Sequence, residues 1–220
     1  MTTARRTLAV LVSGSGTNLQ ALLDASAERD FPARVGVVLS NVPGVRALER
    51  ARAAGVPTVV VPHQDVPGRA AYDAALLRAL APHRPDIVCL AGFMRLVGPD
   101  FLRAFPAGVL NIHPALLPSF PGLHGVRQAL AHGVKLTGCT VHLVDEGTDT
   151  GPIVAQSAVP VLDADTEESL AARIQHEEHR LYPLAVRLLA EGRLRREGRR
   201  ILGGAPPREA DDALRNPGAG

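Results

Sequence analysis

The chain has 220 residues, enough for one sizeable α/β domain but short for two. Hydrophobic residues make up 46% and charged residues 21%, and the formal net charge of +2 provides no basic field for nucleic acid. The apolar run at 8–12 is too short for a signal peptide or a membrane span, and Cys89 and Cys139 lie in apolar runs without metal-ligand spacing. We therefore expect a cytoplasmic protein with small-molecule partners, no nucleic acid, no membrane and two buried, reduced thiols.

The first apolar run leads into a glycine-rich loop, 13–18, and then into a helix with apolar spacing. Glycines let backbone amides point at an anion, and the positive end of the helix favours phosphate. Leu19 stands where a dinucleotide fingerprint needs its third glycine, and the Gly-Lys-Ser/Thr of a Walker loop is absent. The pattern predicts a small phosphate site at Gly16, Thr17 and Asn18, with a merely tight turn as the alternative.

Strands and helices alternate along the next hundred residues. Strands are predicted at 35–39, 58–61, 87–90 and 109–113, and helices at 45–54, 69–80, 99–104 and 126–132. This order predicts a single α/β domain with a mostly parallel twisted sheet and helices on both faces. The loop after the fourth strand carries residues 94–97, which are candidates for lining an apolar pocket, although packing alone would also explain them.

Asn111 and His113 are two apart near the end of a strand, so both side chains leave the same face of the sheet. Pro114 has no amide hydrogen and ends the pairing, which places both residues near the carboxyl end of the strand, where open α/β sheets hold ligands. An amide that grips a carbonyl oxygen beside an imidazole that carries a proton is typical of acyl transfer. A turn cap and a packed histidine are the structural alternative.

Two further strands are predicted at 135–144 and 153–161, and the alternation within 140–144 predicts one wetter face for the first. The loop that joins them carries Asp145, Glu146 and Asp149. A carboxylate near His113 would stabilise the charged imidazolium, and solvated turn residues are the alternative.

Thr166 predicts the start of a long helix. On this helix His176 and His179 are three apart, not the four of a zinc signature, and no metal is assigned. Beyond a domain at 1–189, we expect an edge hairpin in the basic segment at 190–204 and a disordered tail at 205–220.

Six motifs carry a resemblance to a known family. They are Ser13 to Ala21, Ala91 to Arg95, Asn111 to Pro118, Pro121 to His124, Thr140 to His142 and Asp149 to Pro152. In this order and spacing, residues 8–189 closely resemble the phosphoribosylglycinamide formyltransferase family, folate-dependent enzymes of purine biosynthesis that formylate glycinamide ribonucleotide. Thr17 replaces an expected Ser but keeps the hydroxyl, and the residues after Arg199 do not align.

The resemblance implies a Rossmann-like formyltransferase fold, 10-formyltetrahydrofolate as co-substrate, no metal, and a monomer or weak homodimer. It implies Asn111, His113 and Asp149 as catalytic residues. It implies contacts to glycinamide ribonucleotide from Gly16, Thr17, Asn18 and Glu178. It implies folate contacts from Arg69, Met94, Arg95, Leu96, Val97, Asn111, Asp145 and Asp149.

Three alternatives remain. Formyltetrahydrofolate hydrolase shares the Asn-x-His and the aspartate but carries an additional amino-terminal domain, whereas the first strand here starts by Leu8. Methionyl-tRNA formyltransferase shares the trio and carries a further carboxyl-terminal domain, for which the residues after Leu189 are few. A sugar-phosphate-binding module without turnover is the third, since a fold alone does not prove chemistry.

Overall fold

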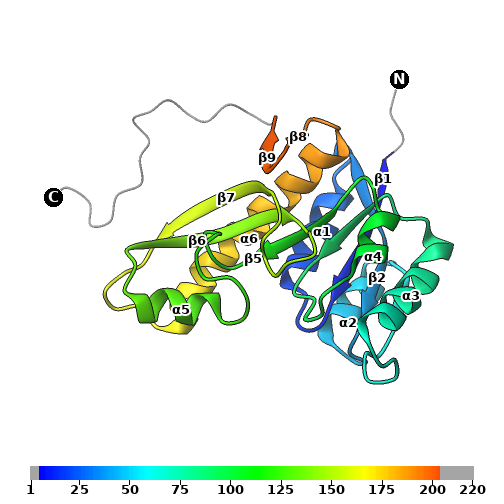
Figure 1. The fold of residues 1–220 in the computed structure, drawn as a ribbon, viewed down its shortest axis with the longest axis horizontal. Coiled ribbons are helices and arrows are strands. Elements are labelled where there is room, and N and C mark those ends of the chain that lie inside the picture. The colour runs from blue at the N-terminus through cyan, green and yellow to red at the C-terminus, as the bar shows by residue number, and fades with distance from the viewer. Residues whose placement is uncertain (1–4, 204–220) are drawn as a thin grey trace.

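The computed structural model describes residues 5–203, and within them a seven-stranded sheet has the order β3-β2-β1-β4-β5-β6-β7 (Figure 1). The strands are β1 Arg6–Val12, β2 Ala33–Ser40, β3 Thr58–Val60, β4 Ile87–Leu90, β5 Val109–His113, β6 Leu136–Leu143 and β7 Ile153–Pro160. The pairings from β3 through β5 are parallel, whereas β5 with β6 and β6 with β7 are antiparallel. The prediction of a mostly parallel α/β sheet is therefore confirmed.

Helices cover both faces of the sheet (Figure 1). They are α1 Thr17–Ala27, α2 Arg46–Ala53, α3 Arg69–Leu80, α4 Pro99–Ala104, α5 Gly125–His132 and α6 Glu167–Ala190. One apolar core joins the sheet to α1, α2, α5 and α6, and a second joins its other face to α3 and α4. Both cysteines are free and buried, as expected.

The sequence order reverses between β1 and β4, which lie side by side in the sheet. Chain segments leave two such neighbouring strands in opposite directions, so a crevice opens at their carboxyl ends. The glycine-rich loop follows β1, the loop at 91–98 follows β4, and Asn111 and His113 end β5. The fold thus gathers the predicted functional segments at one edge of the sheet.

One expectation about β6 is wrong. The alternation predicts a wetter face at Thr140 and His142, yet these residues are 0% and 2% exposed. The segment after β5 folds over this face, and the Thr140 hydroxyl donates to the Ala115 carbonyl at 2.7 Å and accepts from the Leu117 amide at 3.0 Å. The polar alternation is real, but it serves buried hydrogen bonds rather than solvent.

The basic segment after α6 forms a separate two-stranded antiparallel sheet, β8 Arg195–Glu197 and β9 Arg200–Leu202 (Figure 1). It is not part of the main sheet. The expected disordered tail at 205–220 lies outside the described residues.

Tyr182 ties α6 to the centre of the sheet. Its side chain is fully buried, and its hydroxyl lies 3.0 Å from the Leu90 carbonyl and 3.1 Å from the Leu110 carbonyl. Leu90 is the last residue of β4, and Leu110 directly precedes Asn111 in β5. Water cannot replace a donor at so buried a position.

We predict that Tyr182→Phe lowers the free energy of unfolding by about 1–2 kcal/mol, because the buried hydrogen that the two carbonyls share is lost. Urea denaturation measures this loss. Tyr72→Phe is the matched control, since its hydroxyl donates to the Val61 carbonyl in a partly buried loop and should cost less. Equal losses in the two variants would contradict the prediction.

Candidate active site

Asn111 and His113 leave β5 on one face and lie opposite two polar residues of β6. The antiparallel register pairs Asn111 with His142 and His113 with Thr140. Val109 on the same face packs in the second core, whereas Leu110 and Ile112 point into the first core. The period of two predicted from the sequence therefore holds, and it aims both polar side chains at the cleft.

Asp149 brings this group together from the loop between β6 and β7. Its Oδ2 accepts a hydrogen bond from the Gly122 amide at 2.8 Å and lies 3.3 Å from His113 Nδ1. Its Oδ1 lies 3.4 Å from Asn111 Nδ2 and 3.5 Å from His142 Nε2. One carboxylate thus contacts the two strands and the covering loop.

Both ring nitrogens of His113 face oxygen acceptors. Nδ1 faces the Asp149 carboxylate, and Nε2 lies 2.8 Å from the Phe120 carbonyl. A neutral imidazole has one N–H and can satisfy only one acceptor, whereas an imidazolium has two. The surroundings of His113 therefore suit its charged form.

The carboxyl of Asp149 is partly buried, which by itself would raise its pKa. Hydrogen bonding with His142, the Gly122 amide and the nearby His113 outweigh burial and lower the pKa below the ordinary value. Asp149 is therefore ionised at neutral pH and supplies a fixed negative charge to the site.

The sequence reasoning gave no role to His142, although it lies inside the cluster. Its Nδ1 faces the Leu143 carbonyl at 3.0 Å, and its Nε2 lies 3.1 Å from Asn111 Nδ2. When only Nδ1 carries a proton, Nε2 accepts from the Asn111 amide; when Nε2 carries one, it donates to Asp149 Oδ1 at 3.5 Å instead. Thr140 and His142 alternate with apolar residues in the sequence. This pattern, together with an antiparallel pairing of β6 to β5, would have placed His142 opposite Asn111.

An open cleft of about 400 Å³ begins at these polar groups. The predicted residues Met94, Arg95, Leu96, Val97, Asn111, His113, Asp145 and Asp149 all line it, together with His142 and Leu123. Met94 and Leu96 are 61% and 56% exposed, which leaves an apolar surface open at the mouth. The cleft combines that surface with a few convergent polar groups, as small-molecule sites do.

Arg69 lies beside this cleft rather than in it. It lines a neighbouring depression with His63 and Tyr72, and its guanidinium donates to the Val97 carbonyl. Asp73, four residues on, accepts from the Gly98 amide at 2.8 Å. Helix α3 therefore holds the loop that lines the cleft.

The predicted phosphate loop forms a second polar region. Gly16 has a φ of 72°, and a Cβ there would lie 2.6 Å from the Ala47 Cβ, so glycine is required. Asn18 Nδ2 donates to Glu178 Oε2 at 2.8 Å, and burial raises the pKa of that carboxyl. Gln175 was not predicted, but its Nε2 donates to the Thr17 hydroxyl at 3.1 Å. Gln175 and Glu178 share a face of α6 at i, i+3 spacing.

A single hydroxyl connects the phosphate loop to the cleft. Ser13 Oγ accepts from the Met94 amide at 2.8 Å and donates to Asn41 Oδ1 at 2.5 Å. The two predicted binding regions are therefore neighbours, although only the folate-type residues line the large cleft. Glu178 and Gly16 to Asn18 lie outside its lining.

Among residues 5–203, no group of three or more His, Cys, Asp or Glu side chains is arranged to hold a metal ion. In the same range, none of the helices has the length and apolar character needed to cross a bilayer.

Fold and site together define a doubly wound α/β protein whose ligand cleft lies at the carboxyl ends of β4 and β5, beside its topological switch point. Residues 6–186 match the family model described as formyl transferase. The chain belongs to the formyl transferase family, and it is a formyl-transferring enzyme.

Curated relatives and solved structures agree. The phosphoribosylglycinamide formyltransferase of Mycobacterium tuberculosis is 56% identical over 183 residues, which cover 83% of this chain and 84% of that protein. The trifunctional purine biosynthetic protein adenosine-3 of Drosophila melanogaster is 50% identical over 190 residues, 86% of this chain but only 14% of that protein. The structure of glycinamide ribonucleotide transformylase 1 from Symbiobacterium toebii superimposes with a TM-score of 0.88 at 56% identity, over 90% of this chain and 94% of that chain.

The lowered pKa of Asp149 predicts a pH-dependent contribution to stability. Ionised Asp149 stabilises the fold above its unfolded pKa of about 3.9, and this contribution is lost as the pH falls through the lower folded pKa. The difference in unfolding free energy between wild type and Asp149→Asn should therefore be largest at pH 7 and shrink below about pH 4. Urea titrations at pH 7 and pH 3 measure it, and a difference independent of pH would contradict the prediction.

Proposed function

We propose that this protein transfers the formyl group of 10-formyltetrahydrofolate to the amine of glycinamide ribonucleotide, giving formylglycinamide ribonucleotide and tetrahydrofolate in purine biosynthesis. The observation that carries the proposal is the convergence of Asn111, His113 and Asp149 at one end of a largely apolar cleft. The high identity to a phosphoribosylglycinamide formyltransferase over most of both chains supports the same substrates.

In the proposed reaction, the neutral amine attacks the formyl carbon and the carbonyl oxygen becomes anionic. Asn111 Nδ2 and the imidazolium of His113 donate hydrogen bonds to that oxygen. The hydrogen on His113 Nε2 is directed at the Phe120 carbonyl in this structure. A developing oxyanion is a stronger acceptor than a carbonyl and would take that hydrogen bond over.

Asp149 has two roles in the proposal. Its negative charge, 3.3 Å from His113 Nδ1, stabilises the imidazolium. It also helps to move a proton, through water, from the attacking amine to the folate nitrogen as the tetrahedral intermediate collapses. Its lowered pKa leaves it ionised and therefore able to accept that proton transiently.

The binding assignments follow from the two polar regions. The pteridine would lie on the apolar surface of Met94 to Val97, with Arg95, Asp145 and Arg69 at or beside the cleft. The ribonucleotide phosphate would lie at Gly16, Thr17 and Asn18, the N-cap and first two residues of α1, where backbone amides are free of helical partners. Glu178 would bind the ribonucleotide together with its hydrogen-bond partner Asn18. The Ser13 to Met94 hydrogen bond keeps the two regions adjacent, as direct transfer requires.

The test mixes purified protein with 10-formyltetrahydrofolate, with and without glycinamide ribonucleotide, and follows tetrahydrofolate release. Release that depends on the ribonucleotide is the expected result. Equal release without it would mean that water is the acceptor, and a formyltetrahydrofolate hydrolase would replace the proposal. Binding of the ribonucleotide without any release would favour a sugar-phosphate-binding module.

We predict that Asn111→Ala, His113→Ala and Asp149→Ala each lower turnover by about a hundredfold or more, because each removes stabilisation of the oxyanion or of its donor. Steady-state kinetics measure kcat, and urea denaturation measures how much the fold is affected. Glu146→Ala is the control, since Glu146 is exposed in the same loop. Wild-type turnover in Asp149→Ala would count directly against the assignment.

A further inference from the structure

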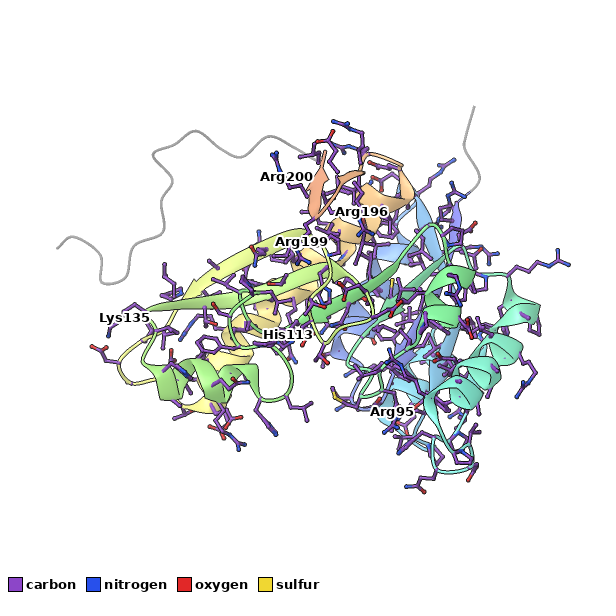
Figure 2. All side chains as sticks on the ribbon, in the orientation of Figure 1. Arg95, His113, Lys135, Arg196, Arg199 and Arg200 are labelled. Atoms are coloured by element: carbon purple, nitrogen blue, oxygen red, sulfur yellow. The ribbon has the colours of Figure 1, made fainter. Side chains whose placement is uncertain are left out.

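The basic hairpin β8–β9 has no part in the function proposed so far. It lies on the upper side of the molecule in this view, next to β7, where Figure 2 labels Arg196, Arg199 and Arg200. Arg195 pairs with Glu197 inside the hairpin, and Arg196 donates to the Gly198 carbonyl at the turn. These contacts are local and do not reach the site.

Arg199 differs from its neighbours because it reaches another part of the chain. Its Nη2 donates to the Thr150 carbonyl at 2.7 Å, across 49 residues of sequence. Arg200, the next residue, makes no side-chain hydrogen bond or ion pair within residues 5–203. The two arginines carry the same charge on the same hairpin, Arg199 in its turn and Arg200 at the start of β9, and of the two only Arg199 binds Thr150.

Thr150 directly follows Asp149, and the loop around them is tightly held. Inside the loop, Asp145 Oδ1 accepts from the Gly147 amide at 3.1 Å and from the Thr150 hydroxyl at 2.6 Å. At its exit, a Cβ on Gly151 would lie 1.7 Å from the Leu143 carbonyl, so the chain is pressed against β6.

Asp149 itself has a φ of 54°, in the left-handed region that non-glycine residues seldom adopt. A residue keeps such a conformation only where its surroundings impose it. The carbonyl of Thr150, the residue after Asp149, accepts a hydrogen bond from Arg199. This contact holds the backbone beside Asp149 from outside the loop.

We propose that Arg199 is a positioning residue, which holds the Asp149 carboxylate within reach of His113 and Asn111 by binding the Thr150 carbonyl. A guanidinium is always charged and presents its N–H groups in a rigid plane, so it is well suited to fix a carbonyl. The inference rests on the proposed function, in which a small displacement of Asp149 weakens turnover more than binding.

The test compares Arg199→Ala with Arg200→Ala, which removes the same charge from the adjacent position of the same hairpin. In Arg199→Ala, kcat should fall by about tenfold while KM for both substrates stays within about twofold. Arg200→Ala should stay within about twofold of wild type in all three constants. Arg199→Lys keeps the charge and one donor and should recover part of kcat. Raised KM values of equal size in both alanine variants would mean that the hairpin only attracts anionic substrates, and the proposal would be wrong.

A second readout does not depend on activity. Carbon-13 NMR of the Asp149 carboxyl across pH reports how closely Gly122 and the histidines surround it. Arg199→Ala should raise the pKa of Asp149 towards the ordinary value, whereas Arg200→Ala should leave it near that of wild type. If wild type shows no transferase activity but Arg199→Ala still raises the pKa of Asp149, the proposed function fails while the positioning role stands. An unchanged pKa in Arg199→Ala would overturn the positioning role.

Discussion

The site depends on the shared contacts of a single carboxylate. Asp149 faces the Gly122 amide and His113 with one oxygen, and Asn111 and His142 with the other. Donors and charges from two strands and a loop meet at this one group, so its negative charge decides how they point. In a partly dry site such a charge acts more strongly than it would in water.

The fold supplies the fixed frame on which that charge acts. The antiparallel register places His142 opposite Asn111, and the loop that follows β4 lines the cleft beside them. Two loops of the site are held by distant elements. Asp73 of α3 binds the Gly98 amide of the cleft loop, and Arg199 of the hairpin binds the Thr150 carbonyl next to Asp149. The proposed chemistry therefore rests on elements that are far apart in sequence.

The sequence predicted those features whose cause is local. Helix 69–80 and strand 109–113 have the predicted bounds, since apolar spacing and a flanking glycine or proline determine them. The common face of Asn111 and His113 follows from the two-residue period of a strand in the same way. Asp149 and the phosphate loop entered through motifs that also lie within short segments.

Features that depend on distant pairing were missed or misjudged. The face of β6 was expected to be wet because alternation shows polarity but not what covers it, and His142 was overlooked for the same reason. Asn18 and Glu178 were predicted as separate contacts, yet they bond to each other across 160 residues. The sequence places a positive charge at Arg69 but does not show where its side chain points, and the guanidinium binds the Val97 carbonyl.

The central claim is that Asn111, His113 and Asp149 act as one unit. The most direct measurement is kcat of the double variant Asn111→Ala/Asp149→Ala beside its two single variants. Residues that act together are strongly non-additive, so the double variant should lose about as much turnover as the more damaging single variant. If the two losses multiply instead, the side chains act independently and the account is contradicted.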